Sequence, residues 1–233
     1  MSHSHTERKR SLRPHGIFVL AVLLLLITAP TALADRITGV TATTNMGSGF
    51  GTNLQNTVNG VGLSALSLTA THAGTIPNNS WVSSTSLTGQ ITFNLGGLFS
   101  VDSFSFWNQN GGGPGLAGLT GIQNVQVPLS TNGIDFTPLL GGPSAFARVT
   151  GAANLPPQIF SFTGVNATHF RFSALSNYGD TFQTGFAEVG FNGSPAGGAP
   201  IPEPTTMLLL GTGLAGVGAA VRKRRKAHTN EEA

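Results

Sequence analysis

Cysteine is absent from this 233-residue sequence. The chain therefore forms no disulfide bonds and offers no thiolate to a metal ion, two devices that often stabilise small exported domains. A domain of this composition outside the cell would depend on its apolar core, or on a cation with oxygen ligands such as calcium.

Charge is scarce and unevenly distributed. Charged residues make up 9% of the chain, and most of the basic ones lie before Ile17 or after Val221. Residues 35–200 contain only three arginines and five acids: Arg36, Arg148, Arg171, Asp35, Asp102, Asp135, Asp180 and Glu188. Nucleic-acid binding needs clustered cations that neutralise phosphates. This nearly neutral segment lacks them, which excludes that class of protein.

Convergent catalytic groups are also missing. His72 and His169 lie in unrelated segments, and no serine occupies a nucleophile-elbow pattern. A glycosidase pair could still be formed by Asp135 with Asp180 or Glu188, since sequence does not show which acids meet in the fold. Asp135, however, is explained by the chemistry of a turn. We therefore expect a protein that is not an enzyme.

The N-terminal segment has the three parts of a secretory signal. Basic residues precede an apolar stretch from Ile17 to Ile27, and Ala32-Leu33-Ala34 offers small residues to signal peptidase. The basic residues are Arg8, Lys9, Arg10 and Arg13. Eleven apolar residues are too few to span a bilayer. Residues 1–34 are therefore predicted to be a signal peptide cleaved before Asp35.

The C-terminal segment combines Pro-Glu-Pro, an apolar run and a basic cluster. The apolar run at 205–221 would form a helix about 25 Å long, slightly short of the roughly 30 Å hydrocarbon core. We expect a marginal transmembrane helix that serves as a temporary anchor. The basic cluster at 222–226 would remain cytoplasmic by the positive-inside rule, leaving the preceding chain outside.

Residues 201–233 resemble the PEP-CTERM sorting signal of Gram-negative bacteria. The motif residues are Pro202, Glu203, Pro204, Arg222, Lys223, Arg224 and Arg225. The resemblance implies recognition by an exosortase, transient anchoring in the inner membrane, and delivery to the cell surface or extracellular matrix.

Residues 35–193 are predicted to form an all-β domain. Apolar residues alternate with polar ones in several segments, as in strands with one buried face. The alternating residues are Ile91, Phe93 and Leu95, Phe104 and Phe106, Phe160 and Phe162, and Phe170 and Phe172. Asn-Gly pairs at 59–60, 110–111, 132–133 and 192–193 favour tight turns between strands. We expect an antiparallel sandwich or jelly roll, followed by a flexible linker at 194–200.

A series of short segments in this domain resembles, in order, a discoidin (coagulation-factor type C) domain. The segments are 59–60, 81–83, 91–96, 101–108, 129–137, 169–172 and 185–189. The resemblance implies a galactose-binding-like β-sandwich whose loops at one end hold sugars or other surface ligands. It also implies that the arginine of the 169–172 segment, Arg171, is structural.

Calcium is the one cofactor that this resemblance offers. In the family, the loop at 59–60 usually carries an aspartate and helps to hold a structural calcium ion, which an acid at the position of Glu188 can complete. Asn59 keeps a carbonyl ligand but removes a charge. We therefore expect weak or absent calcium binding, with Glu188 as its main ligand.

A polar loop near the end of the domain carries the candidate sugar-binding residues. Tyr178 is the only tyrosine of the chain, and its ring could stack on a sugar. Asn177 and Asp180 flank it and could bond hydroxyl groups. Trp81 and Trp107 lie beside strand patterns and are predicted to be buried.

Two functions follow from these observations. The first is a surface or matrix protein that binds polysaccharide or cell-surface glycan; the second is a structural, adhesive protein of the biofilm matrix without a small-ligand site. Binding of ice or a mineral surface by threonine-rich strands is a third alternative, although the threonines form no regular array.

Overall fold

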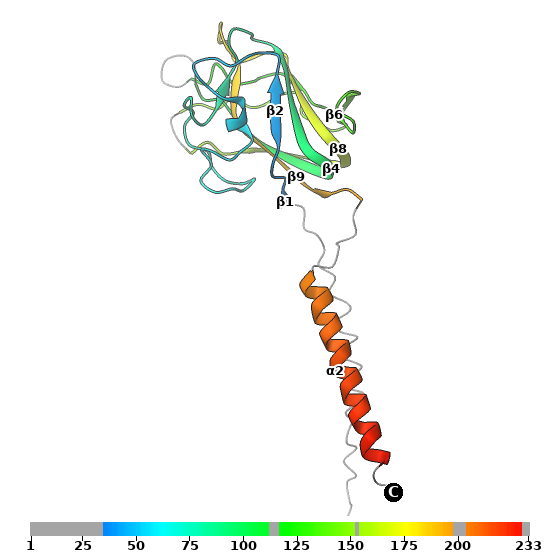
Figure 1. Ribbon diagram of the computed structural model, residues 1–233. Helices are drawn as coiled ribbons and strands as arrows, with labels where there is room; N and C mark the ends of the chain where they lie inside the picture. Colours follow the sequence, from blue (N-terminus) through cyan, green and yellow to red (C-terminus); the bar gives the residue numbers. More distant parts are fainter. Residues whose placement is uncertain (1–34, 112–116, 152–153, 198–203, 230–233) are drawn as a thin grey trace, which may run out of the picture. The chain divides into compact units, whose positions relative to one another are not determined.

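The structure is a computed structural model that describes residues 35–111, 117–151, 154–197 and 204–229 (Figure 1). The predicted signal peptide at 1–34 lies outside the described residues, as do Pro202 and Glu203 of the sorting motif.

The β domain is an antiparallel sheet that folds over itself into a sandwich. Its strands are β1 (Asp35–Arg36), β2 (Thr41–Thr44), β3 (Trp81–Val82), β4 (Gly89–Asn108), β5 (Val125–Gln126), β6 (Pro128–Ser130), β7 (Thr137–Pro138), β8 (Gln158–Ala174) and β9 (Gly185–Pro195). The main order is β1-β9-β4-β8-β6-β7, with β2 on β4, β3 on β9 and β5 on β8. The all-β prediction is therefore confirmed.

Strand β4 joins the two layers because it changes partners along its length. Its first part pairs with β2 and β8, and its second part pairs with β8 and β9. Between them the register with β8 shifts from Asn94 to Phe99, around Gly96 at φ +81°. An irregularity of this kind bends a strand and lets one long strand serve both layers.

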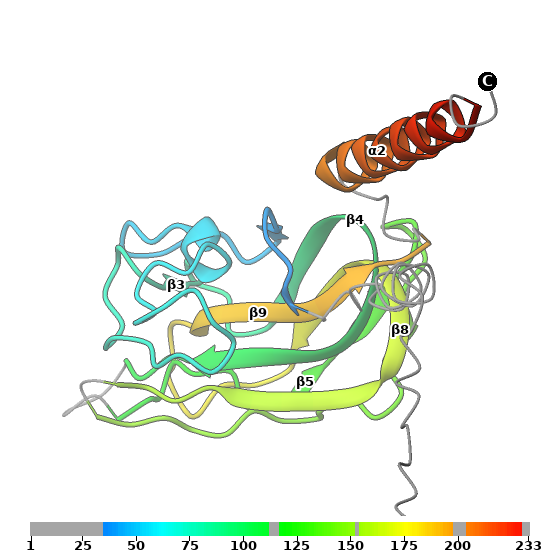
Figure 2. The ribbon, with the colours of Figure 1, turned by 90° about the horizontal axis from the view of Figure 1, so that it is seen from below.

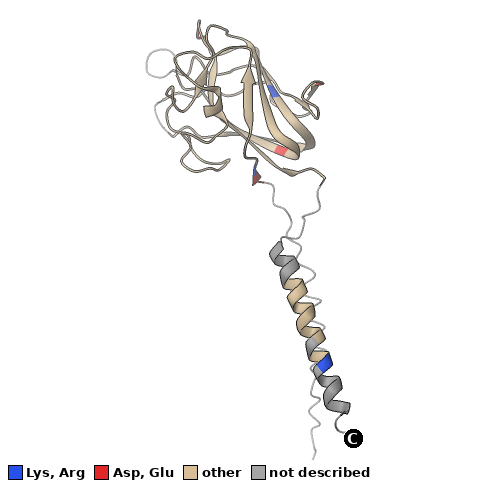
Figure 3. Cartoon of the chain, viewed as in Figure 1, with Lys and Arg blue, Asp and Glu red and all other residues tan. Residues whose placement is uncertain are grey.

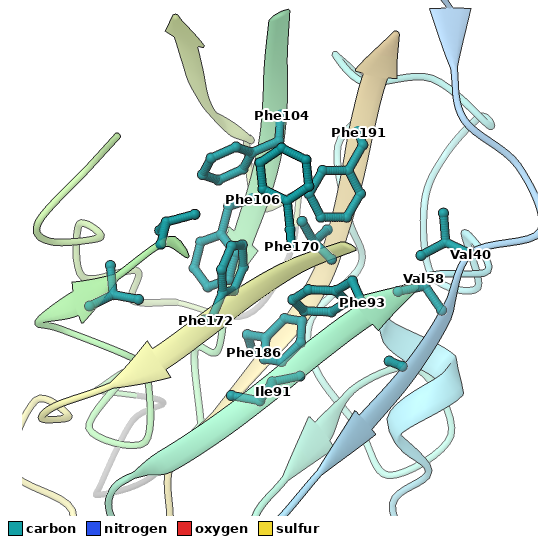
Figure 4. Packing of buried hydrophobic residues seen from close by; sticks show 14 of the residues in the cluster. Val40, Val58, Ile91, Phe93, Phe104, Phe106, Phe170, Phe172, Phe186 and Phe191 are labelled. Atoms are coloured by element: carbon teal, nitrogen blue, oxygen red, sulfur yellow. The ribbon is translucent and has the colours of Figure 1, made fainter. Parts of the chain in front are cut away.

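Aromatic side chains fill the space between the layers, as the period-two pattern predicts (Figure 4). Phe104 is fully buried, and its ring contacts aromatic rings of β8 and β9. Trp81 and Trp107 are also fully buried, which confirms their predicted place in the core. The indole N–H of Trp107 donates to the carbonyl of Ala70, so its polar edge is satisfied without water.

One predicted turn is wrong, and another is present in a longer form. Asn192-Gly193 lies inside β9, where a Cβ on residue 193 would approach the Ser100 carbonyl to 2.6 Å; glycine is needed there for close strand packing. Asn132-Gly133 lies between the paired strands β6 and β7 as predicted, in a loop at 131–136 with Gly133 at φ +76°. The loop is longer than a two-residue turn, and the Asn132 side chain accepts the backbone N–H groups of Ile134 and Asp135.

Helix α2 spans Pro204–Thr229 and begins at the proline of the sorting motif, a residue that suits the first turn of a helix. It continues through the basic cluster, beyond the predicted end at residue 221. Among the described residues, no helix has the length and apolar character needed to cross a membrane. The predicted transmembrane helix is therefore not confirmed.

The segment at 61–80 folds around a buried histidine. His72 is fully buried, and its backbone exchanges hydrogen bonds with Leu155 at 2.9 and 2.8 Å. Its Nε2 has no hydrogen-bond partner among the described residues. Burial lowers the pKa of His72 below 6.5, because the charged imidazolium would lose its hydration.

We expect acid to destabilise the domain through His72. A pKa that is lower in the folded state gives stability that is present above pH 6.5 and is lost as the pH falls. The urea midpoint of the native protein should drop between pH 7.5 and pH 5 more than that of His72→Gln. The half-buried His169 provides the control, since His169→Gln should change the profile less. If the urea midpoints of the native protein and of His72→Gln fell equally between pH 7.5 and pH 5, His72 would not be the source of the acid sensitivity.

Candidate ligand-binding site

A pocket of about 410 Å³ lies among the loops at one end of the sandwich. Its walls come from five separate parts of the chain. The lining residues are Phe50, Thr52, Thr75, Ile76, Pro77, Ser80, Val82, Gln109, Gly111, Thr120, Asp180, Phe182 and Gln183. The volume is in the range of small-ligand sites.

Two aromatic side chains at this pocket are directed into solvent. Phe50 is 79% exposed and Phe182 is 74% exposed. By contrast, the aromatic rings that contact one another lie in or against the core. Ile76, also a lining residue, is 56% exposed. Exposed apolar groups gathered beside a cavity are typical of a surface that is covered by a ligand.

Phe50 occupies an unfavourable backbone conformation. It has φ +50° and is followed by Gly51 at φ +70°, and the Thr52 N–H donates to the Gly49 carbonyl at 2.9 Å. This is the geometry of a tight turn in which asparagine, aspartate or glycine is usual, and a bulky residue with positive φ is uncommon. Burial does not explain the strain, since the ring is exposed. Strain without a packing reason points to a role in binding.

The turn that carries Phe50 packs directly against the loop that carries Phe182. A Cβ on residue 49 would lie 2.3 Å from Nε2 of Gln183 and 2.5 Å from the Ser83 carbonyl, so only glycine permits this approach. Gln183 Nε2 donates to the same Ser83 carbonyl at 3.0 Å. The two exposed rings therefore belong to one structural unit.

Asn177 and Asp180, predicted to bond a sugar, form the framework of the Phe182 loop. Asp180 Oδ1 accepts the N–H groups of Phe182 and Gln183 at 2.8 and 2.9 Å. Asn177 Nδ2 donates to the carbonyls of Asp180 and Gln183 at 2.9 and 2.7 Å. Asp180 also lines the pocket, whereas Asn177 is not among the lining residues.

Tyr178 has a different environment from the one expected for a sugar platform. Its hydroxyl donates to the Phe146 carbonyl, and the guanidinium carbon of Arg148 lies 5.8 Å from its ring centroid. Its backbone N–H donates to the Leu119 carbonyl at 3.0 Å. The residue is half-buried and is not among those that line the pocket. These contacts attach the loop to the domain.

The floor of the pocket carries buried polar side chains. Gln109 and Thr120 are 4% and 5% exposed, and Gln109 Oε1 and Thr120 Oγ1 have no hydrogen-bond partner among the described residues. A Cβ on Gly111 would lie 3.5 Å from Thr120 Oγ1 and 3.6 Å from Gln109 Oε1. Buried polar atoms are normally paired, so unpaired ones beneath a cavity can serve a polar ligand.

The walls of the pocket are almost uncharged. Among its described lining residues, Asp180 alone carries a charge. The arginines of the β domain are engaged elsewhere: Arg148 donates to Ala117, and Arg171 donates to Thr92 and lies 3.6 Å above the Phe136 ring. Figure 3 shows how few charged segments the domain carries. The contacts of Arg171 fit the structural role predicted for it.

Asn59 and Glu188, the predicted calcium ligands, lie on adjacent segments. Glu188 is fully buried on β9, and its Oε1 accepts the N–H of Gly60 at 2.9 Å. Asn59 is exposed, and its Oδ1 accepts the Val61 N–H at 2.9 Å. Among the described residues, no group of three or more His, Asp and Glu side chains could hold a metal ion.

Sequence reasoning missed the two exposed phenylalanines. A signal was present for each, since neither belongs to a period-two strand pattern. Phe50 is flanked by Gly49 and Gly51, and Phe182 lies in the same polar loop as Tyr178, four positions later in the chain.

Residues 200–225 match the PEP-CTERM protein-sorting motif, which confirms the sorting motif predicted from the sequence. No curated protein matches the chain significantly.

Among solved structures, those similar to the chain include family 32 carbohydrate-binding modules. That of Clostridium perfringens NanJ, in complex with galactose, is 16% identical with a TM-score of 0.48, over 69% of this chain and 98% of that one. CBM32-1 from a Clostridium perfringens family 31 glycoside hydrolase is 8% identical with a TM-score of 0.48, over 68% and 96%. The module of AlyQ, in complex with 4,5-unsaturated mannuronic acid, is 20% identical with a TM-score of 0.43, over 68% and 97%.

Proposed function

We propose that this protein is a non-catalytic carbohydrate-binding protein of the cell surface or extracellular matrix, with its ligand site at the pocket between Phe50 and Phe182. The observation that carries the proposal is the pair of exposed rings beside a polar floor. Sugars present apolar C–H faces and a rim of hydroxyl groups, so aromatic rings and hydrogen-bonding groups together suit them.

The charge of the pocket supports a neutral sugar as the ligand. Asp180 would repel the carboxylate of a uronic acid, and among the described lining residues no cation compensates for it. Gln109 and Thr120 can bond hydroxyl or N-acetyl groups instead. A neutral or N-acetylated saccharide therefore fits the pocket better than an acidic one.

The direction of β9 supports a pocket that lies at the end of the domain opposite to the sorting motif. The Phe182 loop leads into the first residue of β9, Gly185, and the last, Pro195, leads toward the sorting motif. Figure 2 shows β9 running across the domain between these two ends. Eleven residues of strand extend for about 36 Å. The pocket would thus face outward while the chain is held at the opposite end of the sandwich.

Glycan profiling of the purified mature protein tests the proposed function. Neutral and N-acetylated oligosaccharides should bind, and they should raise the melting temperature because they bind only the folded state. Oligomers of uronic acids should not. Binding confined to uronates would contradict the charge argument. A protein that binds no saccharide would instead be the structural, adhesive matrix protein.

Export and sorting form the second part of the proposal. The matched motif supports recognition by an exosortase after signal peptidase has removed residues 1–34, with the helix at 205–221 as a transient inner-membrane anchor. Intact-mass analysis of the surface form should give Asp35 as the first residue and should lack the basic cluster 222–226. A mature protein that keeps both ends would contradict this processing.

A further inference from the structure

An arginine occupies the position next to the predicted calcium ligands. Arg36, in β1, is 8% exposed, and its Nη2 donates to Oε1 of Glu188 and to the carbonyl of Val58 at 3.3 Å. The same Glu188 oxygen accepts the Gly60 N–H. One guanidinium therefore connects β1, the turn after the 3-10 helix Leu54–Thr57, and β9.

The residues at this position do not fit a calcium ion. Calcium takes six to eight oxygen ligands, generally with several carboxylates. Here the one carboxylate has its Oε1 paired with Arg36, which leaves only Oε2 without a partner among the described residues, and Asn59 directs its carbonyl oxygen to its own turn. A divalent cation bound to Glu188 would also lie beside a buried guanidinium, and the two positive charges would repel each other.

We infer that the Arg36 guanidinium is a built-in structural cation in this domain. It neutralises the buried acid of β9 and binds a backbone carbonyl of the neighbouring turn, which are the tasks of a bound calcium ion. Folding is therefore independent of calcium. Burial raises the pKa of the Glu188 carboxyl to about 7, and the Arg36 guanidinium opposes this shift by favouring the charged form.

The ion pair lies near the segment that reaches the candidate pocket. A Cβ on Gly190 would lie 3.0 Å from Nη1 of Arg36 and 2.6 Å from Leu68, so the guanidinium and the segment at 61–80 both approach β9 at this glycine. That segment continues to Thr75 and Ser80, which line the pocket.

Thermal unfolding of the full-length protein with EDTA and with calcium chloride tests the inference. The melting temperature of the native protein should change by less than about 1 °C in either condition, because no metal binds. Arg36→Gln should lower it by roughly 6–20 °C, since a buried carboxylate is left without its partner. Arg148→Gln, which removes an exposed arginine without a carboxylate partner, should lower it by only about 1–2 °C.

A double variant separates the ion pair from simple loss of packing. Arg36→Gln with Glu188→Gln should be more stable than Arg36→Gln alone, because no uncompensated charge remains. The double variant also keeps the test decisive if Arg36→Gln does not fold. A double variant that folds when Arg36→Gln fails to fold supports the Arg36–Glu188 ion pair. The inference is overturned if EDTA lowers the native melting temperature, if Arg36→Gln matches Arg148→Gln, or if the double variant is no more stable than Arg36→Gln.

Discussion

Phe104→Ala is expected to lower the free energy of unfolding by about 3–5 kcal/mol, the usual cost of removing a buried phenylalanine ring. Phe104 is fully buried between the layers. Its ring centroid lies 5.1–6.4 Å from five others, those of Phe146, Phe160, Phe162, Phe172 and Phe191. These rings come from different strands and a loop, so the cavity left by alanine cannot close without moving several elements.

Urea denaturation measures this effect through the shift of the midpoint at constant slope. The matched control is Phe182→Ala, which removes the same ring from a site that is 74% exposed and should change stability by no more than about 0.5 kcal/mol. A loss below about 1.5 kcal/mol for Phe104→Ala would show that the space between the layers is not filled as the structure has it.

Phe182→Ala is expected to reduce affinity for the bound saccharide by roughly 5- to 30-fold. Loss of an aromatic face that stacks on a sugar costs about 1–2 kcal/mol of binding free energy, and 1.4 kcal/mol corresponds to a factor of ten. Phe50→Ala should weaken binding similarly, and it should change stability by no more than about 0.5 kcal/mol, because the ring is 79% exposed and alanine keeps the same Cβ at this positive-φ position.

Isothermal titration with the saccharide found by profiling gives both affinities. Ile134→Ala is the control, since Ile134 is 81% exposed and is not among the pocket-lining residues. Its affinity should equal that of the native protein. Unchanged affinity in both Phe50→Ala and Phe182→Ala would place the saccharide elsewhere on the domain, even if saccharide binding itself is confirmed.

The strands were predictable because their chemistry is local. Apolar residues alternate with other residues at 91–95, 104–106 and 170–172, which indicates a strand with one buried face. This signal does not depend on which strand packs beside it. The sorting motif is likewise read from consecutive residues. The Asn-Gly pair at 192–193 gave a wrong prediction, because glycine also serves close packing, as Gly193 does beside Ser100.

The sequence alone therefore determined the β class, the buried tryptophans and the sorting motif, all of which depend on residues near one another in the chain. Only the tertiary structure decided which side chains meet. The pocket joins residues from Phe50 to Gln183, and the Arg36–Glu188 pair joins the first strand to the last. Such contacts depend on how distant segments pack, and no local pattern records that Arg36 would meet the acid expected to bind calcium.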